Sequence, residues 1–266
     1  ISLGLVGSEM CIRDRNYMKQ IMEEKAQNYK NGKINYVTEK VVKDSTITLT
    51  INNEISRNLS AIEDSLEEFA VGYLFNENMV KSLEDIEKIE INENHINVEI
   101  DDKLLKTKET VLCSDSSGGW RSKIKEIKPI SSDFQVEADE LINRIEELKN
   151  NAQIWQATGG THVAGIVYKN NFIVKEDVSR HVAVDKVIGY GILHNYDLSN
   201  SYVIYSGRMP ADMVIKIVRA GIPVLASNAA PAYSGCETAK KGNVTLVGFL
   251  RGQRFNVYNN KNRIIF

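Results

Sequence analysis

In the first half of the chain, apolar positions follow strand and helix periods in turn. Residues 36–51 are rich in Val, Ile and Thr with partial alternation, which predicts two strands joined near Lys43 and Asp44. A helix with Asp64 or Ser65 as its cap should follow. The segments 89–91 and 96–100 then alternate as a hairpin. The apolar residues of the helix are Leu66, Phe69, Ala70, Tyr73 and Leu74. We predict a small α+β unit.

In the second half, strands and helices alternate from Thr158 onwards. A charged amphipathic helix over about 137–151 bridges the two halves. Such alternation is typical of a layered sheet with helices on both faces. The predicted strands are 163–168, 172–175, 202–205, 223–227 and 245–250, and the predicted helices are 180–193, 210–220 and 233–241.

Residues 113–135 interrupt this pattern. The stretch CSDSSGGW that opens the segment is rich in Ser and Gly and has no apolar period, so we interpret it as a loop. It contains Cys113, and cysteine is usually buried. An exposed thiol on a mobile loop could carry a sulfur atom between two partners, whereas a half-buried structural cysteine is the alternative. Cys236 falls in a predicted helix and is interpreted as a core residue.

Composition limits the classes of function. The chain has 266 residues, a net charge of −2 and 42% hydrophobic residues, so a broad nucleic-acid-binding face is not expected. No apolar run is long enough for a membrane span, and no Cys and His residues have zinc-site spacing. Cys11, Cys113 and Cys236 form no disulfide framework, which favours a cytoplasmic setting.

The first fifteen residues differ from the rest. ISLGLVGSEMCIRDR lacks a basic start and its apolar part is interrupted by Glu9, so it is not a typical signal peptide. It is similar to a translated sequencing adaptor. We therefore exclude it from the fold and expect native sequence to begin near Asn16.

A short turn near the C-terminus has the composition of an anion-binding site. Arg251 and Arg254 flank Gly252 between two predicted strands. Glycine allows the backbone to approach a ligand, and two guanidinium groups donate strongly to phosphate. The alternative is an exposed hairpin turn with two solvated arginines.

Three further polar clusters lie at ends of predicted strands, where ligands bind in such sheets. Residues 158–162 (TGGTH) could bring backbone and His162 to a ligand, or form a simple turn. Residues 176–186 place Arg180 and His181 at the start of a helix. Because the helix dipole disfavours cations there, this pair indicates an anionic ligand or a buried carboxylate partner. A salt-bridge network is the alternative. Residues 206–208 (SGR) suit phosphate at the start of a helix.

These motifs together resemble the formate dehydrogenase accessory sulfurtransferase family (FdhD/NarQ). The resemblance spans about Asn35 to Tyr258. It is carried by FAVGYLFNE at 69–77, ATGGTH at 157–162, EDVSRHVAVDKVIG at 176–189, SGR at 206–208, RAGIPVLAS at 219–227 and TLVGFLRGQRFNVY at 245–258.

The resemblance implies a function. Members take sulfur from a cysteine desulfurase as a persulfide and pass it to the molybdenum cofactor, bis-(molybdopterin guanine dinucleotide), which then enters formate dehydrogenase. Cys113 matches the persulfide cysteine, and His162, His181 and Arg208 are further pocket candidates. A homodimer is expected. The positions that match the cofactor-binding segment are Phe249, Leu250, Arg251, Gly252, Gln253 and Arg254.

The resemblance also implies a fold. Residues 16–135 are expected to form a small α+β domain that ends in the Cys113 loop. Residues 136–266 are expected to form a three-layer αβα domain of the cytidine-deaminase-like type. The deaminase zinc signature is absent from the sequence, so deamination is not implied.

The sequence departs from the family pattern in the cysteine loop. Ser116 stands where the family has a second cysteine, and Ser179 and Val182 replace a common Gly and Asn. A persulfide carrier needs only one thiol. The chain is therefore expected to be an active sulfurtransferase or, alternatively, a non-catalytic chaperone that binds the molybdenum cofactor.

Overall fold

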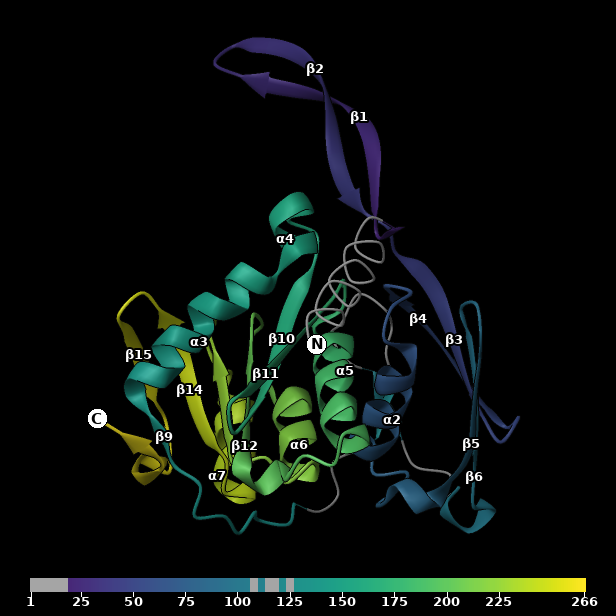
Figure 1. Cartoon of the computed structure of the whole chain (residues 1–266), viewed down its shortest axis with the longest axis vertical. Helices are drawn as coiled ribbons and strands as arrows, with labels where there is room; N and C mark the ends of the chain where they lie inside the picture. Colours follow the sequence, from purple (N-terminus) through teal and green to yellow (C-terminus); the bar gives the residue numbers. More distant parts are fainter. Residues whose placement is uncertain (1–18, 106–109, 113–119, 123–126) are drawn as a thin grey trace, which may run out of the picture.

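The computed structural model describes residues 19–105, 110–112, 120–122 and 127–266. Its sheets lie in two groups, with a layer of helices between them (Figure 1). The helices are α2 (Leu66–Asn76), α3 (Ala138–Asn151), α4 (Gln153–Thr158), α5 (Arg180–Leu193), α6 (Ala211–Arg219) and α7 (Tyr233–Gly242). No helix among the described residues is long and apolar enough to cross a membrane.

A six-stranded mixed sheet organises the second half of the chain. Its strand order is β11-β10-β12-β13-β14-β15. The neighbours β12, β13 and β14 run parallel, whereas β10 runs antiparallel to both of its neighbours. Each face of this sheet carries its own apolar cluster. Helix α3 packs on one face, and α5, α6 and α7 pack on the other. The strands are β10 (His162–Tyr168), β11 (Asn171–Asp177), β12 (Ser201–Tyr205), β13 (Val224–Ser227), β14 (Thr245–Arg251) and β15 (Arg254–Val257).

A four-stranded sheet in the first half has the order β4-β3-β6-β5 and packs against α2. Helix α2 then crosses α5 at close range, because both helices carry glycine at the crossing. A Cβ atom on Gly72 would lie 1.9 Å from the carbonyl oxygen of Asp185, and one on Gly189 would lie 1.8 Å from that of Glu68. The strands are β3 (Ser45–Ile51), β4 (Ile55–Ala61), β5 (Ile86–Asn92) and β6 (His95–Ile100).

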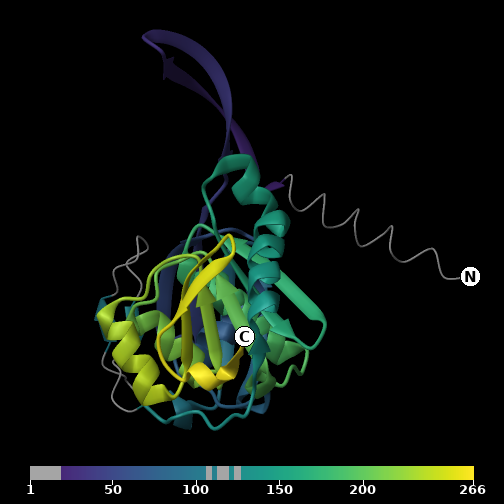
Figure 2. The ribbon, with the colours of Figure 1, turned by 90° about the vertical axis from the view of Figure 1, so that its left-hand side faces the viewer.

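A long β-hairpin projects away from both sheets. Strands β1 (Ile21–Lys30) and β2 (Lys33–Val42) pair antiparallel along ten residues each. Figures 1 and 2 show this arm extending beyond α4, with only its base near the rest of the molecule. We call residues 21–42 the arm.

Most elements predicted from the pattern are present at the predicted places, but Trp120, the last residue of the predicted loop CSDSSGGW, lies in a strand. Residues Trp120–Ser122 form strand β8, which pairs with β7 (Thr110–Leu112). Helix α4 was not predicted, nor was β1. Two short strands, β9 (Val136–Glu137) and β16 (Ile264–Ile265), pair beside the C-terminus.

Candidate functional site

One edge of the six-stranded sheet gathers polar residues from several strands, most of them predicted from the sequence. The carboxyl ends of β12, β13 and β14 lie at this edge because these strands are parallel. The first residue of β10 lies there too, because β10 runs the other way. His162, Ser206, Asn228 and Arg251 are therefore placed along the same edge by successive strands.

A pocket of about 390 Å³ opens at this edge between α3, α4 and the ends of β10, β12 and β13. It joins the TGGTH segment to the SGR segment. The hydroxyl of Ser206 accepts a hydrogen bond from the Val163 amide at 2.9 Å and lies 3.4 Å from Nδ1 of His162. The residues that line the pocket are Ile145, Leu148, Lys149, Ala152, Trp155, Gly159, Gly160, Thr161, His162, Val163, Val178, Ser206 and Asn228.

Glu176 does not line this pocket but holds two residues that do, Trp155 and Thr161. Its carboxylate accepts hydrogen bonds from the amides of Ile154 and Trp155, at 2.9 and 2.8 Å, and from the hydroxyl of Thr161 at 2.9 Å. The carboxylate therefore caps the first turn of α4 and holds Thr161 at the end of the glycine turn. Burial raises the pKa of Glu176, against the opposing effect of these hydrogen bonds.

The environment of His162 at the pocket favours its neutral form. Burial lowers its pKa, and the positive charge of Arg180 lowers it further, against the raising effect of a hydrogen bond to the Ser206 backbone. A neutral imidazole offers one donor and one acceptor. His162 can therefore orient a polar ligand but adds no positive charge.

His181, one member of the predicted basic pair at the start of α5, has a carboxylate partner. His181 is fully buried, with Nε2 3.4 Å from a carboxylate oxygen of Asp212 on α6. Burial on its own would raise the pKa of Asp212, but the hydrogen bond and charge of His181, together with Arg180, bring it down to about 2. The carboxylate partner expected from the helix dipole is thus present, although Asp212 is only partly buried, and His181 does not line the pocket.

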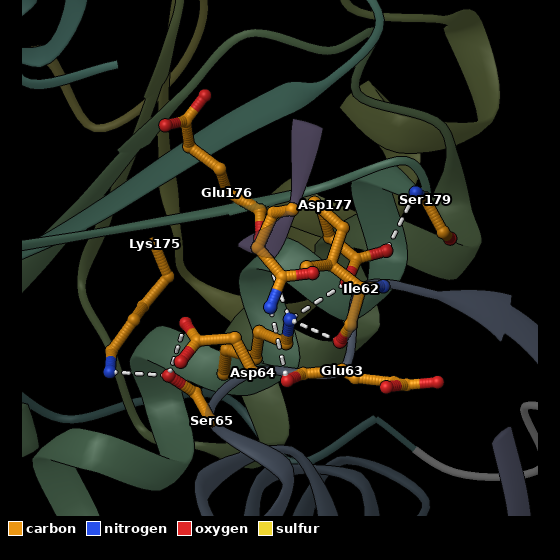
Figure 3. Close-up of polar contacts among 10 residues, drawn as sticks. Ile62, Glu63, Asp64, Ser65, Lys175, Glu176, Asp177 and Ser179 are labelled. Carbon is orange, nitrogen blue, oxygen red and sulfur yellow. Dashed lines mark hydrogen bonds and ion pairs between the residues drawn. The ribbon is translucent and has the colours of Figure 1, made fainter. Parts of the chain in front are cut away.

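The rest of that cluster is a buried network between the two sheets. The carboxylate of Asp177 accepts from Lys186 Nζ at 2.8 Å, from the Ile62 amide at 3.1 Å and from the Ser179 amide at 2.9 Å. Figure 3 shows Asp177 pointing to Ile62 while Glu176 points to the other side of β11. Further along α5, Asp185 pairs with Lys216. These charges hold the fold and are not free for a ligand.

The FLRGQR turn, between β14 and β15, lies at the same edge of the six-stranded sheet as the pocket. Arg251 and Arg254 are directly opposite each other in the β14–β15 hairpin, and both are exposed. Like charges opposite each other are unfavourable. No ion pair in the described part of the chain involves either arginine. With Phe249, Phe255 and Asn256 they line a hollow of about 210 Å³.

Backbone geometry at Phe249 supports a special role for this turn. Phe249 has φ = 54°, a left-handed conformation that is unfavourable for a bulky residue, and the β14–β15 register shifts at this point. Such conformations often accompany binding sites. The Phe249 amide donates to the carbonyl of Ala229 at 3.0 Å, and the neighbouring Asn228 lines the larger pocket. The pocket and the arginine turn are therefore adjacent.

The remaining predicted residues are spread over several environments. Leu250 is fully buried in the core, so only its backbone could face a ligand, whereas Gly252 and Gln253 are exposed. Arg208 is exposed beyond the Ser206 turn. Cys236 is partly buried against the core of α5–α7. Cys113 and Ser116 lie outside the described residues. Cys113 directly follows β7 in the sequence.

Sequence reasoning missed Trp155 and Asn228. Trp155 is 44% exposed and lines the pocket from α4, a helix too short to show a period. Asn228 follows the last residue of β13, and this position after a parallel strand was the only available signal.

Comparisons with known proteins show to which family the chain belongs. The model of the FdhD/NarQ family matches residues 42–265. The sulfur carrier protein FdhD of Methanothermobacter thermautotrophicus is 47% identical over 86% of this chain and 93% of its own length. The protein FdhD of Methanocaldococcus jannaschii is 34% identical over 86% of this chain and 92% of its own length.

A solved structure is also similar. The crystal structure of a candidate formate dehydrogenase accessory protein from Desulfotalea psychrophila superposes with a TM-score of 0.77 at 27% identity. The match covers 92% of this chain and all of that one. The chain described here belongs to the FdhD/NarQ family, as its motifs predict.

Proposed function

We propose that this chain is a sulfurtransferase that carries sulfur as a persulfide on Cys113, from a cysteine desulfurase to the molybdenum cofactor destined for formate dehydrogenase. Membership of the FdhD/NarQ family supports this proposal, as does 47% identity to a sulfur carrier protein. Cys113 is the proposed carrier because it matches the persulfide cysteine of the family.

The loading step is a thiol exchange. The Cys113 thiolate attacks the terminal sulfur of the desulfurase persulfide and forms a new S–S bond. The old S–S bond breaks, and the desulfurase cysteine leaves as its thiolate. No net oxidation occurs, since one persulfide is consumed and one is made. A single cysteine is sufficient, so Ser116 does not prevent this step.

The observation that carries the cofactor assignment is the opposed pair Arg251 and Arg254. Two exposed guanidiniums without a carboxylate partner among the described residues form a site for a dianionic group. A guanine dinucleotide contains such a group in its pyrophosphate. The adjacent 390 Å³ pocket, lined by the aromatic side chain of Trp155 and the imidazole of His162, suits a flat polar ring. The molybdenum cofactor is the substrate that combines both parts.

The finer fold assignment belongs to the same proposal. We assign residues 136–266 to a cytidine-deaminase-like αβα domain and residues 16–135 to a smaller α+β domain. The strand order β11-β10-β12-β13-β14, with β10 antiparallel, supports the first assignment, and the separate core of α2 with β3–β6 supports the second.

Intact mass after incubation with a cysteine desulfurase and cysteine tests the proposal. We expect a gain of one sulfur atom on the wild type, reversed by a thiol reductant, and no gain on Cys113→Ala. Cys236→Ala is the matched control and should load like the wild type. An unloaded wild type that still binds guanosine diphosphate would instead support the cofactor-binding chaperone.

A further inference from the structure

The arm has apolar side chains that nothing in the described chain covers. Tyr29 and Ile34 are directly opposite each other, and Tyr36 lies on the same face two residues further along β2. Their exposed fractions are 74%, 64% and 83%. A two-stranded hairpin is marginally stable in water on its own. This arm therefore needs a packing partner along its outer part.

The outer part of the arm is also positively charged. Residues 25–38 contain Lys25, Lys30 and Lys33 and no carboxylate. The three carboxylates of the arm, Glu23, Glu24 and Glu39, lie nearer its base. A partner for the outer part should thus present an open strand edge, apolar surface and negative charge.

The body of the molecule offers a groove with these properties along β11. Among the described residues, β11 pairs only with β10 and is the edge of the six-stranded sheet. Its apolar residues Phe172, Ile173 and Val174 are only partly buried, whereas the neighbouring strand is almost wholly buried. A groove of about 400 Å³ follows this edge, lined by Gln20, Asp64, Ser65, Glu147, Asn151, Gln153, Ile154, Phe172, Ile173, Val174, Lys175, Glu176 and Tyr190.

The charge of the groove complements the arm. Asp64 and Glu147 face it, and Glu176 is hydrogen-bonded to α4 at its rim. The only cation among the lining residues is Lys175, which donates to Ser65 at 2.7 Å and pairs with Glu68 at 3.0 Å. Glu147 pairs with Arg144 at 2.6 Å, so Asp64 carries much of the free negative charge.

We propose that the arm of one copy adds as a strand along the β11 edge of a second copy, and that the second arm does the same in return. Strand addition to an exposed edge is a common recognition mode, and it removes the open edge of β11. The exchange is self-complementary, as a two-fold dimer requires. The family match begins at residue 42, so all of the arm except its last residue lies outside the segment that the family model describes.

Size and continuity favour a second copy as the occupant. Two ten-residue strands reach roughly 33 Å from the body. The arm and the groove together provide the roughly 20 to 30 residues per partner that a stable interface uses. Gln20 at the base of the arm lines the groove of its own chain, and its carbonyl accepts the Lys43 amide at 2.8 Å. Arm and groove are therefore neighbours, and one two-fold axis can bring each arm to the other groove.

Analytical ultracentrifugation of the full chain tests this proposal. We expect a dimer for the wild type and a dimer dissociation constant raised roughly tenfold or more by Ile34→Lys, because a buried apolar side chain is lost. Ile91→Lys is the matched control, since Ile91 is also an exposed strand isoleucine beside a hairpin turn. It should leave association unchanged. A monomeric wild type, or equal effects of the two variants, would overturn the proposal.

A photo-crosslinking amino acid at position 36 locates the contact. In a mixture of isotope-labelled and unlabelled chains, we expect crosslinks between copies to residues 147–153 or 171–176. Crosslinks within one copy, or between two arms only, would overturn the exchange even if the protein is a dimer.

Discussion

Two pairs of basic residues in this chain each resemble an anion-binding site in the sequence, but the structure places them in opposite environments. Arg180 and His181 begin α5, where His181 is fully buried against Asp212. Arg251 and Arg254 flank the β14–β15 turn, where both are exposed and no ion pair among the described residues involves either. We infer from this difference that a basic cluster is a candidate ligand site only where the fold leaves its charge without a carboxylate partner.

The buried region should respond to mutation as part of the fold. Lys186→Met leaves Asp177 as a buried carboxylate without its cation, so we expect a loss of about 3 to 5 kcal/mol in the free energy of unfolding. Urea denaturation measures this loss. Lys240→Met is the matched control, because Lys240 and Glu237 are also 2.8 Å apart but Lys240 is 60% exposed. Equal effects of the two variants would contradict the division between the regions.

The exposed pair should respond as a binding site. For Arg251→Ala/Arg254→Ala we expect a loss of at least about 100-fold in affinity for guanosine diphosphate, since each charge-assisted hydrogen bond contributes roughly 1.5–3 kcal/mol. The unfolding free energy should stay within about 0.5 kcal/mol. Isothermal titration calorimetry measures the affinity, with Lys261→Ala as an exposed cationic control. An unchanged affinity would place the phosphate elsewhere.

The ion pair between His181 and Asp212 also predicts a pH dependence of stability. The pKa of Asp212 is lowered from 3.8 to about 2, so its contribution is full above pH 4 and disappears as the pH falls towards 2. We expect Asp212→Asn to cost about 2 kcal/mol at pH 7 and little near pH 2. Urea titrations of both proteins at several pH values measure the difference. A constant difference across this range would show that His181 does not stabilise the Asp212 carboxylate.

The smallest effect should come from keeping the charge and removing the planar guanidinium. Arg251→Lys should lower the affinity for guanosine diphosphate by about tenfold, because lysine cannot donate in the bidentate manner. Arg254→Lys should behave alike. A lysine variant as weak as the alanine variant would mean that hydrogen-bond geometry, and not charge, dominates the site.

Sequence patterns predicted the regular elements well because those elements are amphipathic. The amphipathic helix predicted over about 137–151 is α3, which buries Leu141, Ile145 and Leu148 on one face. In the six-stranded sheet, the alternation of strand and helix predicted the edge at which His162, Ser206 and Arg251 meet. Both signals depend on burial of one face, which leaves a period in the sequence.

Features without such a period could not be predicted. The arm buries almost nothing, so β1 mixes charged and apolar residues without alternation, and Met22, Tyr29 and Tyr36 are all exposed. The partner of His181 lies 31 residues away on α6 and depends on how two helices pack. The left-handed conformation of Phe249 carries no signal either, because glycine and asparagine are the residues usual at such positions.

One experiment tests the central claim that sulfur loading and cofactor binding reside on separate residues. Sulfur loading by intact mass and guanosine diphosphate affinity by calorimetry would be measured on the wild type, Cys113→Ala and Arg251→Ala/Arg254→Ala. The account predicts that Cys113→Ala loses loading and keeps affinity, while the arginine variant keeps loading and loses affinity. Loss of both properties in either variant, with the fold intact, would contradict it.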